Sequence, residues 1–314
     1  MDSTVHAEPV SRPPYASLPE QVRAAVERVL GSPVVAARTQ PGGWSPGVAA
    51  RVRCADGSGA FVKAVCSLVD PVTPQMHRAE ARVTALLPAS VGSPRLLGSY
   101  DDGTWVALVL EEVDGRLPEL PWRPAELGAA LRALDRLAVV PAPPGLPAVG
   151  EALGQDFAGW QRLAAAPPGD LSAWQARHLE RLAELESGWA RAAQGDRLLH
   201  LDVRADNLLV CPDGEAVLVD WPSCAVGDPL VDVVCFLPSA VLDGATDPDA
   251  LLLRTAAGRA APPPAVDAVL AAFCGRMEDH ARRPPPPALP GVRAFQAAQA
   301  RVGQAWLQQR TGWA

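Results

Sequence analysis

One stretch of the chain combines acids and an amide in a spacing that suits phosphoryl transfer. Residues 200–207 read His-Leu-Asp-Val-Arg-Ala-Asp-Asn, and a second apolar run after a Pro-Asp-Gly turn ends at Asp220. In phosphoryl transfer a carboxylate meets the attacking hydroxyl, while another carboxylate and an amide oxygen hold Mg²⁺ against the nucleotide phosphates. Asp202, Asn207 and Asp220 supply these residue types, with Asp202 five positions before Asn207.

A single lysine is the second informative residue. All but one of the 28 basic residues are arginine, and the exception, Lys63, lies in the apolar run 60–65. That run predicts a buried strand, where a compact ammonium on a flexible stem can do what a wide guanidinium cannot. Kinases carry a phosphate-pairing lysine in such a strand. The alternative is an ordinary surface lysine, because charged side chains are mostly solvated.

These motifs resemble those of the aminoglycoside phosphotransferase family. The family's loop usually reads H-G-D-x-H-x-x-N, and the corresponding run here is HLDVRADN, with VLVDWPSCAVGDPLVDVV downstream. Leu201 replaces the usual glycine and Arg204 replaces the usual second histidine, so this chain carries a variant loop. The resemblance spans about residues 20–310 and is strongest over residues 200–232.

The resemblance implies a role for each matching loop residue. Carried over position by position, Asp202 is the catalytic base, and Asn207 and Asp220 are the Mg²⁺ ligands. His200 is also counted among the catalytic residues, with the role of ordering the loop. Arg204 is counted among them because it occupies the position of the family's second histidine. Asp206, Asp228 and Asp232 are interpreted as turn, cap or other structural residues.

A glycine-rich segment precedes the lysine strand. Residues 42–47 read Gly-Gly-Trp-Ser-Pro-Gly, about 20 positions before Lys63, and resemble a loop that covers nucleotide phosphates. Glycine lets backbone N–H groups approach phosphates without an intervening side chain. Gly42, Gly43 and Ser45 are therefore candidate nucleotide-binding residues.

In kinases, an acidic residue on the helix after the lysine strand forms an ion pair with the lysine, so we expect such an acid here. The pattern of residues 73–89 predicts a helix whose apolar stripe is Met76, Ala79, Val83, Leu86 and Leu87. Glu80 borders this stripe and is the preferred partner, with Glu112 and Asp70 as alternatives.

The segment Glu111-Glu112-Val113-Asp114-Gly115 follows an apolar strand over residues 105–110. It resembles the hinge of kinases, where backbone groups contact the adenine edge. Glu111 and Val113 are therefore the candidate adenine-binding positions.

The fold class that the resemblance implies is α+β, a bilobal protein-kinase-like fold with a small sheet lobe and a larger, mainly helical lobe. We expect residues 1–17 to lack order, residues 18–114 to form the nucleotide-binding lobe, and residues 115–314 to form the catalytic and acceptor-binding lobe. Apolar periodicity predicts helices at 18–30, 124–139, 150–165, 171–193, 229–242, 249–258, 264–282 and 289–309.

Composition is compatible with this assignment. Residues 1–118 carry 12 acidic and 11 basic groups, whereas residues 119–314 carry 23 and 17. This balance argues against nucleic-acid binding and is compatible with a cationic acceptor. The six cysteines include no C-x-x-C pair, so neither a zinc site nor a disulfide framework is indicated. Without a signal-peptide or membrane-spanning pattern, we expect a cytoplasmic protein, of unknown oligomeric state.

Several acceptors are consistent with this family. Only seven residues separate Asp220 from Asp228, which leaves no room for the activation loop of a protein kinase. The resemblance implies transfer from ATP or GTP, with Mg²⁺, to a small hydroxylated molecule. An aminoglycoside or another antibiotic is one class of acceptor, which would imply antibiotic resistance, and a choline-like alcohol, homoserine or a fructosamine is another. A third possibility is an inactive nucleotide-binding relative that acts through protein contacts.

Overall fold

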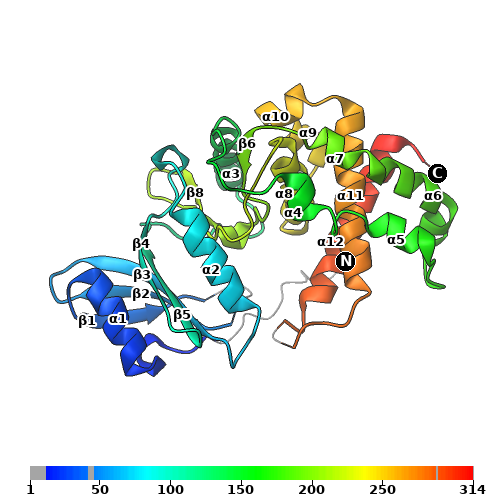
Figure 1. Cartoon of the computed structure of the whole chain (residues 1–314). Helices are drawn as coiled ribbons and strands as arrows, with labels where there is room; N and C mark the ends of the chain where they lie inside the picture. Colours follow the sequence, from blue (N-terminus) through cyan, green and yellow to red (C-terminus); the bar gives the residue numbers. More distant parts are fainter. Residues whose placement is uncertain (1–11, 42–45, 288, 314) are drawn as a thin grey trace.

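The first part of the chain is a five-stranded antiparallel sheet with strand order β1-β2-β3-β5-β4. The computed structural model describes residues 12–41, 46–287 and 289–313. Figure 1 shows this sheet and its two helices as one lobe beside a larger helical lobe. The strands are β1 Val34–Thr39, β2 Val48–Cys54, β3 Gly59–Cys66, β4 Leu96–Asp101 and β5 Trp105–Glu111.

Alternation along β3 divides its side chains between the two faces of the sheet. Val62 and Ala64 are fully buried in a core that they share with Val22 and Val26 of α1 (Glu20–Leu30). Lys63 therefore faces the opposite side, where it meets α2 (Thr73–Thr84). The strand predicted for residues 60–65 is confirmed.

Two expectations for the small lobe were wrong in detail. Tyr15–Ser17 form a 3-10 helix and Tyr15 is buried, so order begins before residue 18; residues 1–11 lie outside the described part. Helix α2 ends at Thr84, and Leu86 is 45% exposed. Val83 is buried as expected, but His77, Glu80 and Thr84 are buried one position after Met76, Ala79 and Val83 of the expected stripe, because α2 borders the cleft as well as the sheet.

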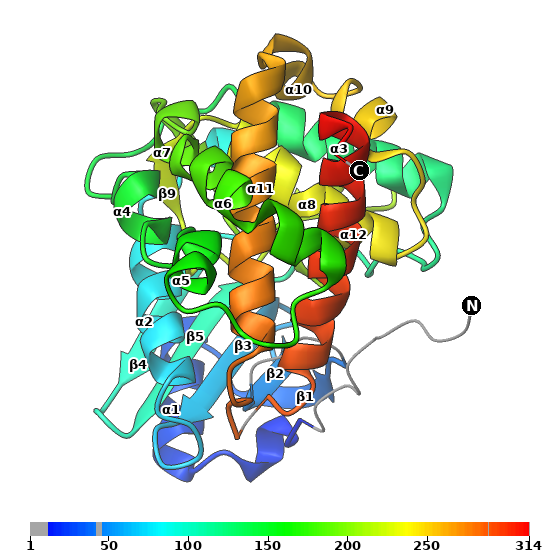
Figure 2. The same ribbon diagram turned by 90° about the vertical axis from the view of Figure 1, so that its right-hand side faces the viewer.

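The second part of the chain is mainly helical and has its own large core. In Figure 2, α11 runs through the middle of this lobe with α12 beside it. The helices are α3 Pro124–Leu137, α4 Val149–Leu153, α5 Gly159–Ala165, α6 Ala173–Ser187, α7 Trp189–Ala192, α8 Leu230–Leu242, α9 Pro248–Leu252, α10 Ala256–Ala260, α11 Pro263–Ala281 and α12 Val292–Thr311. The boundary at residues 114/115 stays a prediction.

Three segments predicted as single helices are each broken in two. Residues 150–165 divide into α4 and α5, because the intervening Phe157 leaves the helical path to occupy a fully buried position in the core. Residues 171–193 divide into α6 and α7, and residues 249–258 into α9 and α10. Apolar periodicity continues through such breaks, which is why it did not reveal them.

Two short antiparallel pairs hold the loops that carry the predicted site. β6 Arg197–Leu199 pairs with β9 Ala225–Gly227, and β7 Leu208–Val210 pairs with β8 Ala216–Leu218. Residues 200–207 leave β6 and enter β7, with η3 Ala205–Asn207 as their last turn. Throughout the described residues, every helix is too short or too polar to cross a membrane.

Candidate active site

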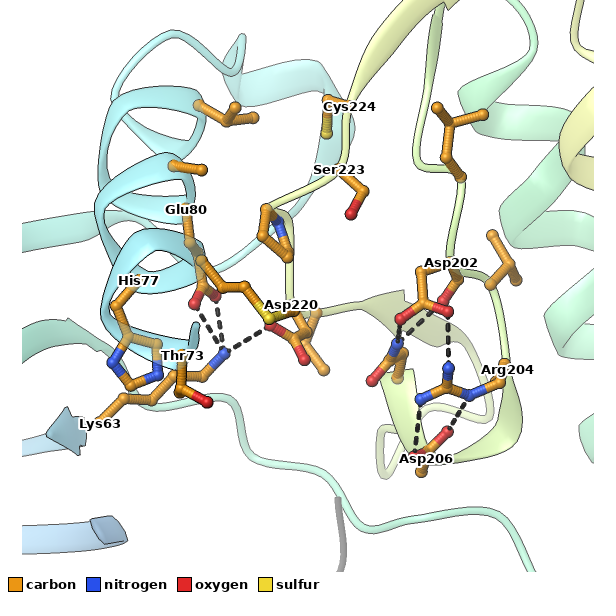
Figure 3. A pocket seen from close by; sticks show the side chains of 18 of the residues that line it. Lys63, Thr73, His77, Glu80, Asp202, Arg204, Asp206, Asp220, Ser223 and Cys224 are labelled. Atoms are coloured by element: carbon orange, nitrogen blue, oxygen red, sulfur yellow. Dashed lines mark hydrogen bonds and ion pairs between the residues drawn. The ribbon is translucent and has the colours of Figure 1, made fainter. Parts of the chain in front are cut away.

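Lys63 joins the two lobes through two carboxylates. Its Nζ lies 2.7 Å from Oε1 and 2.8 Å from Oε2 of Glu80, and 2.9 Å from Oδ1 of Asp220 (Figure 3). We call Lys63, Glu80 and Asp220 the bridging network. The predicted contact between Lys63 and Glu80 is present. The alternatives are engaged elsewhere, since Asp70 accepts a hydrogen bond from the backbone N–H of Thr73 and Glu112 pairs with Arg51 and Arg53.

The Lys63 ammonium attracts both carboxylates of the bridging network, whereas the two carboxylates repel each other. Burial opposes the charge of the Lys63 ammonium, but the carboxylates of Asp220 and Glu80 outweigh this and raise the pKa of Lys63. Burial raises the pKa of Glu80, although Lys63 opposes this shift. His77, which also lies beside this lysine in Figure 3, has a pKa lowered to about 3 by burial and by the Lys63 charge. The imidazole is therefore neutral and adds no second cation.

A second network lies within the loop between β6 and β7. Arg204 donates from Nη1 to Oδ1 of Asp202 at 2.6 Å, and from Nε and Nη2 to the two oxygens of Asp206, both at 3.0 Å. Asn207 donates from Nδ2 to Oδ2 of Asp202 at 2.9 Å and to the Asp202 carbonyl at 2.8 Å. We call Asp202, Arg204, Asp206 and Asn207 the loop network. The pairing of Asp206 with Arg204 was missed at the sequence level, and their spacing of two residues was the available signal.

Asp202 has the environment of a poised base. Burial raises the pKa of Asp202 to about 6, and the Arg204 charge opposes part of this shift. Burial also opposes the charge of Arg204, but Asp202 and Asp206 outweigh it and raise the pKa of that guanidinium. Each oxygen of Asp202 holds one hydrogen bond from the loop network, which leaves a second lone pair on each oxygen. The Asp202 side chain is 34% exposed, so a hydroxyl in the cleft can reach it.

Hydrogen bonds to His200 and Asp232 fix the backbone around Asp202. His200 is fully buried, and its Nδ1 accepts from the Asp202 N–H at 3.3 Å while its Nε2 lies 3.1 Å from the Val219 carbonyl. The backbone N–H groups of His200 and Leu201 both donate to Asp232, each at 2.8 Å. These contacts agree with an ordering role for His200 and a structural role for Asp232.

Leu201 occupies the position where the family usually has glycine. Its φ is 63°, in the left-handed region where a β-carbon is unfavourable, which explains why glycine is common there. The Leu201 side chain packs against the core of the large lobe, and this contact offsets part of the strain. Asp220 has a φ of 69° at the end of the β7–β8 hairpin, and this turn directs its carboxylate toward Lys63.

The predicted hinge borders the same cleft. Glu111 and Val113 both line it. The Glu111 side chain pairs with Arg95, and its backbone N–H donates to the Arg95 carbonyl at 2.9 Å, so neither group is available to a ligand. The backbone N–H and C=O of Val113 have no hydrogen-bond partner among the described residues. Gly42, Gly43 and Ser45 lie outside the described residues.

Both networks open onto one cleft between the lobes, with a volume of about 1340 Å³. The described residues contain no group of three or more His, Cys, Asp or Glu side chains arranged to hold a metal ion. A metal ion that is held partly by a bound substrate needs fewer protein ligands. Asn207 donates from Nδ2 to Asp202, which leaves Oδ1 available, and Asp220 binds Lys63 through Oδ1, which leaves Oδ2 available. Mg²⁺ is often held by one or two protein oxygens together with phosphates, so these residues fit such an ion.

Solved structures share this fold. An aminoglycoside phosphotransferase from Alicyclobacillus acidocaldarius aligns with 17% identity and a TM-score of 0.58, over 96% of this chain and 97% of that one. A choline/ethanolamine kinase family protein from Mesorhizobium loti aligns with 17% identity and a TM-score of 0.61, over 92% and 94%. A thermostable mutant of the aminoglycoside phosphotransferase APH(4)-Ia, in a ternary complex with AMP-PNP and hygromycin B, aligns with 16% identity and a TM-score of 0.57, over 93% and 96%.

These likenesses establish the protein-kinase-like, two-lobed fold that the sequence predicted. No curated protein matches the chain. A family model described as the phosphotransferase enzyme family matches residues 41–301, which include both networks and the hinge. The chain therefore belongs to the phosphotransferase enzyme family.

Proposed function

We propose that this protein transfers the γ-phosphate of a nucleoside triphosphate to a hydroxyl of a small molecule. In this proposal Asp202 accepts the proton of the attacking hydroxyl. Arg204 and Asn207 hold the Asp202 carboxylate, and His200 orders the backbone beside it. The observation that carries the proposal is that the poised Asp202 carboxylate and the half-buried Lys63 ammonium open onto one cleft.

The nucleotide would occupy the side of the cleft formed by the small lobe and the hinge. Lys63, held by Glu80, would pair with phosphate oxygens, and the backbone at Glu111 and Val113 would contact the base. Gly42, Gly43 and Ser45 are proposed to cover the phosphates. Similar structures solved with AMP-PNP, ADP and AMP support a nucleotide cosubstrate, and both ATP and GTP suit backbone recognition.

Mg²⁺ would be held by Oδ1 of Asn207 and by the Asp220 carboxylate. When bound, the ion supplies positive charge to the phosphate oxygens as transfer proceeds. The residues of this chain contribute the oxygen ligands and keep Asp220 at the lobe interface through Lys63. Asn207 couples this site to the base, because the same amide donates to Asp202.

The proposal is tested with Asp202→Asn. Phosphoryl transfer should fall by about a hundred- to ten-thousandfold, because the side chain can no longer accept a proton. Nucleotide affinity should change little, because the hinge and Lys63 are intact. The measurements are transfer of labelled γ-phosphate to a panel of hydroxylated acceptors and nucleotide binding by calorimetry. An Asp202→Asn variant that keeps more than a tenth of the activity would contradict the role of Asp202.

The same measurements separate this proposal from an inactive relative. An inactive relative would bind nucleotide without transferring phosphate to any acceptor or to water. The lone pairs left on Asp202 favour the active alternative, since its carboxylate is held but not blocked.

A further inference from the structure

The last two long helices of the large lobe, α11 and α12, form a second wall of the cleft. Phe273, Arg276 and Met277 on α11 and Phe295 and Gln299 on α12 line the cleft. We call these five residues the acceptor wall. Their spacings of three and four residues place them on one face of each helix. Figure 2 shows the two helices side by side.

The acceptor wall lies next to the loop network. The Phe295 ring centroid is 6.0 Å from Cζ of Arg204, whose Nη1 contacts Asp202 at 2.6 Å. Arg276 lines the same cleft as Asp202. A molecule whose hydroxyl reaches Asp202 would therefore place its body against these side chains.

The carboxylates of this part of the cleft are already neutralised by cations of the protein. Four acids of the large lobe line the cleft among the described residues: Asp156, Asp202, Asp206 and Asp220. Arg204 pairs with Asp202 and Asp206, and Lys63 pairs with Asp220. Asp156 lies 3.2 Å from Nη2 of Arg276 and 3.3 Å from Nε2 of His280.

This pairing opposes the binding of a polycation. An ammonium group that enters the cleft loses hydration and needs a carboxylate in return. Here it would have to displace an arginine from its acid or compete with Arg204 for the ring of Phe295. The acidic net charge of residues 119–314 is therefore a poor guide to the acceptor, because the acids that face the cleft have partners.

Gln299 supplies the polar recognition element of the wall. Its side chain is only 3% exposed, yet it has no hydrogen-bond partner among the described residues. Its amide atoms are not among the fully buried unpaired atoms of the described residues, so the amide reaches the cleft, where a ligand group can hydrogen-bond to it. Gln304, five positions later on α12, is the counterexample, since it bonds to both Gln175 and Glu278.

We infer that the acceptor is an uncharged hydroxylated molecule with an apolar body, which packs on Met277 and Phe295 and hydrogen-bonds to Gln299. The inference rests on the proposed function, because it takes the hydroxyl at Asp202 as the phosphorylated group. It predicts that charge on the acceptor weakens binding and that the amide of Gln299 contributes to acceptor affinity alone.

The first experiment varies acceptor charge. Kanamycin A is the polycationic probe, tetra-N-acetylkanamycin A is its uncharged counterpart, and chloramphenicol is an uncharged alcohol with an aromatic body. Binding to the protein saturated with AMP-PNP and Mg²⁺ is measured by calorimetry, and transfer is measured with labelled nucleotide. We expect chloramphenicol to bind at least about tenfold more tightly than kanamycin A, and acetylation to strengthen kanamycin binding.

The second experiment compares Gln299→Leu with Gln304→Leu. Gln299→Leu should lower the affinity for chloramphenicol by about tenfold, with unchanged nucleotide affinity and thermal stability. Gln304→Leu should lower thermal stability and leave chloramphenicol affinity unchanged. Tighter binding of kanamycin A than of both uncharged probes, no binding of either uncharged probe, or equal affinities in the Gln299→Leu and parent proteins would overturn the inference. Failure of AMP-PNP itself to bind would instead contradict the proposed function.

Discussion

The bridging network and the loop network contain similar charged groups but connect different parts of the chain. In each, one cation lies between two carboxylates: Lys63 between Glu80 and Asp220, and Arg204 between Asp202 and Asp206. The bridging network joins residues 17 and 157 positions apart in the chain, whereas the arginine of the loop network reaches acids two positions away.

The difference teaches which cation is suited to which task. Lys63 contacts both acids through a single point charge, so it can yield to phosphate oxygens and metal without losing a fixed geometry. Arg204 uses three different nitrogens in a planar fork, which fixes the orientation of Asp202. We infer that the bridging network rearranges when nucleotide binds and that the loop network stays in place.

Asp220→Ala is the strongest test of the bridging network. It removes both a proposed Mg²⁺ ligand and the link between the lobes, so phosphoryl transfer should fall on the order of a thousandfold or more. The affinity for magnesium nucleotide should fall as well. Asn207→Ala should have the same effects less severely, because an amide oxygen is a weaker ligand for Mg²⁺ than a carboxylate. Titration of activity against Mg²⁺ concentration measures both variants, and an unchanged dependence in Asp220→Ala would move the metal site elsewhere.

Lys63→Arg preserves the charge and changes only the shape of the cation. A guanidinium cannot lie between Glu80 and the phosphates at the same depth, so we expect transfer to fall by about a hundredfold. Steady-state kinetics measure this effect. A surface role for Lys63 would predict almost no change.

Chemical labelling of the same lysine provides an independent check. Lys63 is the only lysine of the chain, so an amine-directed acylating reagent reports on it with no background beyond the N-terminus. Bound magnesium nucleotide should protect Lys63 from acylation. Equal labelling with and without nucleotide, together with an active Lys63→Arg variant, would rule out the phosphate-pairing role.

The residues that meet in the candidate site could be selected from the sequence because their signals are local or unusual. Asp202, Asn207 and Asp220 stand out by their spacing beside apolar strands, and Lys63 by being the only lysine. Glu80 followed from its position at the edge of a helical stripe. The partner of Asp220 required the fold, since nothing in the local sequence relates Asp220 to Lys63.

Other features left weak signals in the sequence. Strands β1 and β4 were not predicted, and they are the two edges of the sheet. Edge strands are more exposed: β1 has four consecutive exposed residues, including Val35 at 65%, and β4 alternates between exposed and half-buried residues with none fully buried, so neither shows the pattern of a buried strand. The acceptor wall was missed for another reason: Arg276 and Gln299 look like ordinary helix residues until α11 and α12 are packed together.

Arg204→Lys is the counterpart of the lysine substitution in the loop network. Lysine keeps the charge but cannot bond to Asp202 and Asp206 with the same fork, so the orientation of Asp202 becomes less defined. We expect kcat to fall by about tenfold, with little change in the KM for nucleotide. A larger loss than that of Lys63→Arg would reverse the assignment of the fixed and the adaptable network.

A buried carboxylate outside the cleft gives the prediction with the smallest expected effect. It extends the comparison because its hydrogen-bond partners are backbone N–H groups, whereas the carboxylates of the two networks contact a cation. Glu186 on α6 is fully buried and accepts hydrogen bonds from the backbone N–H groups of Trp160 at 3.0 Å and Gln161 at 2.9 Å. Burial raises the pKa of Glu186 to about 7, and these hydrogen bonds oppose part of that shift.

The raised pKa of Glu186 makes stability depend on pH in a defined direction. The folded chain retains a proton that the unfolded chain releases, so this contribution is complete below the ordinary glutamate pKa of about 4.3 and is lost as the pH rises through about 7. The free energy of unfolding, measured with denaturant at pH 5 and pH 8, should therefore decrease more in the parent than in Glu186→Gln, by at least about 1 kcal/mol. Glu184→Gln, on the exposed face of the same helix, should keep the parent's pH dependence. If Glu186→Gln also keeps the parent's pH dependence, backbone N–H groups stabilise the ionised Glu186 as well as the cations stabilise the acids of the cleft. The contrast between the two kinds of partner would then be wrong.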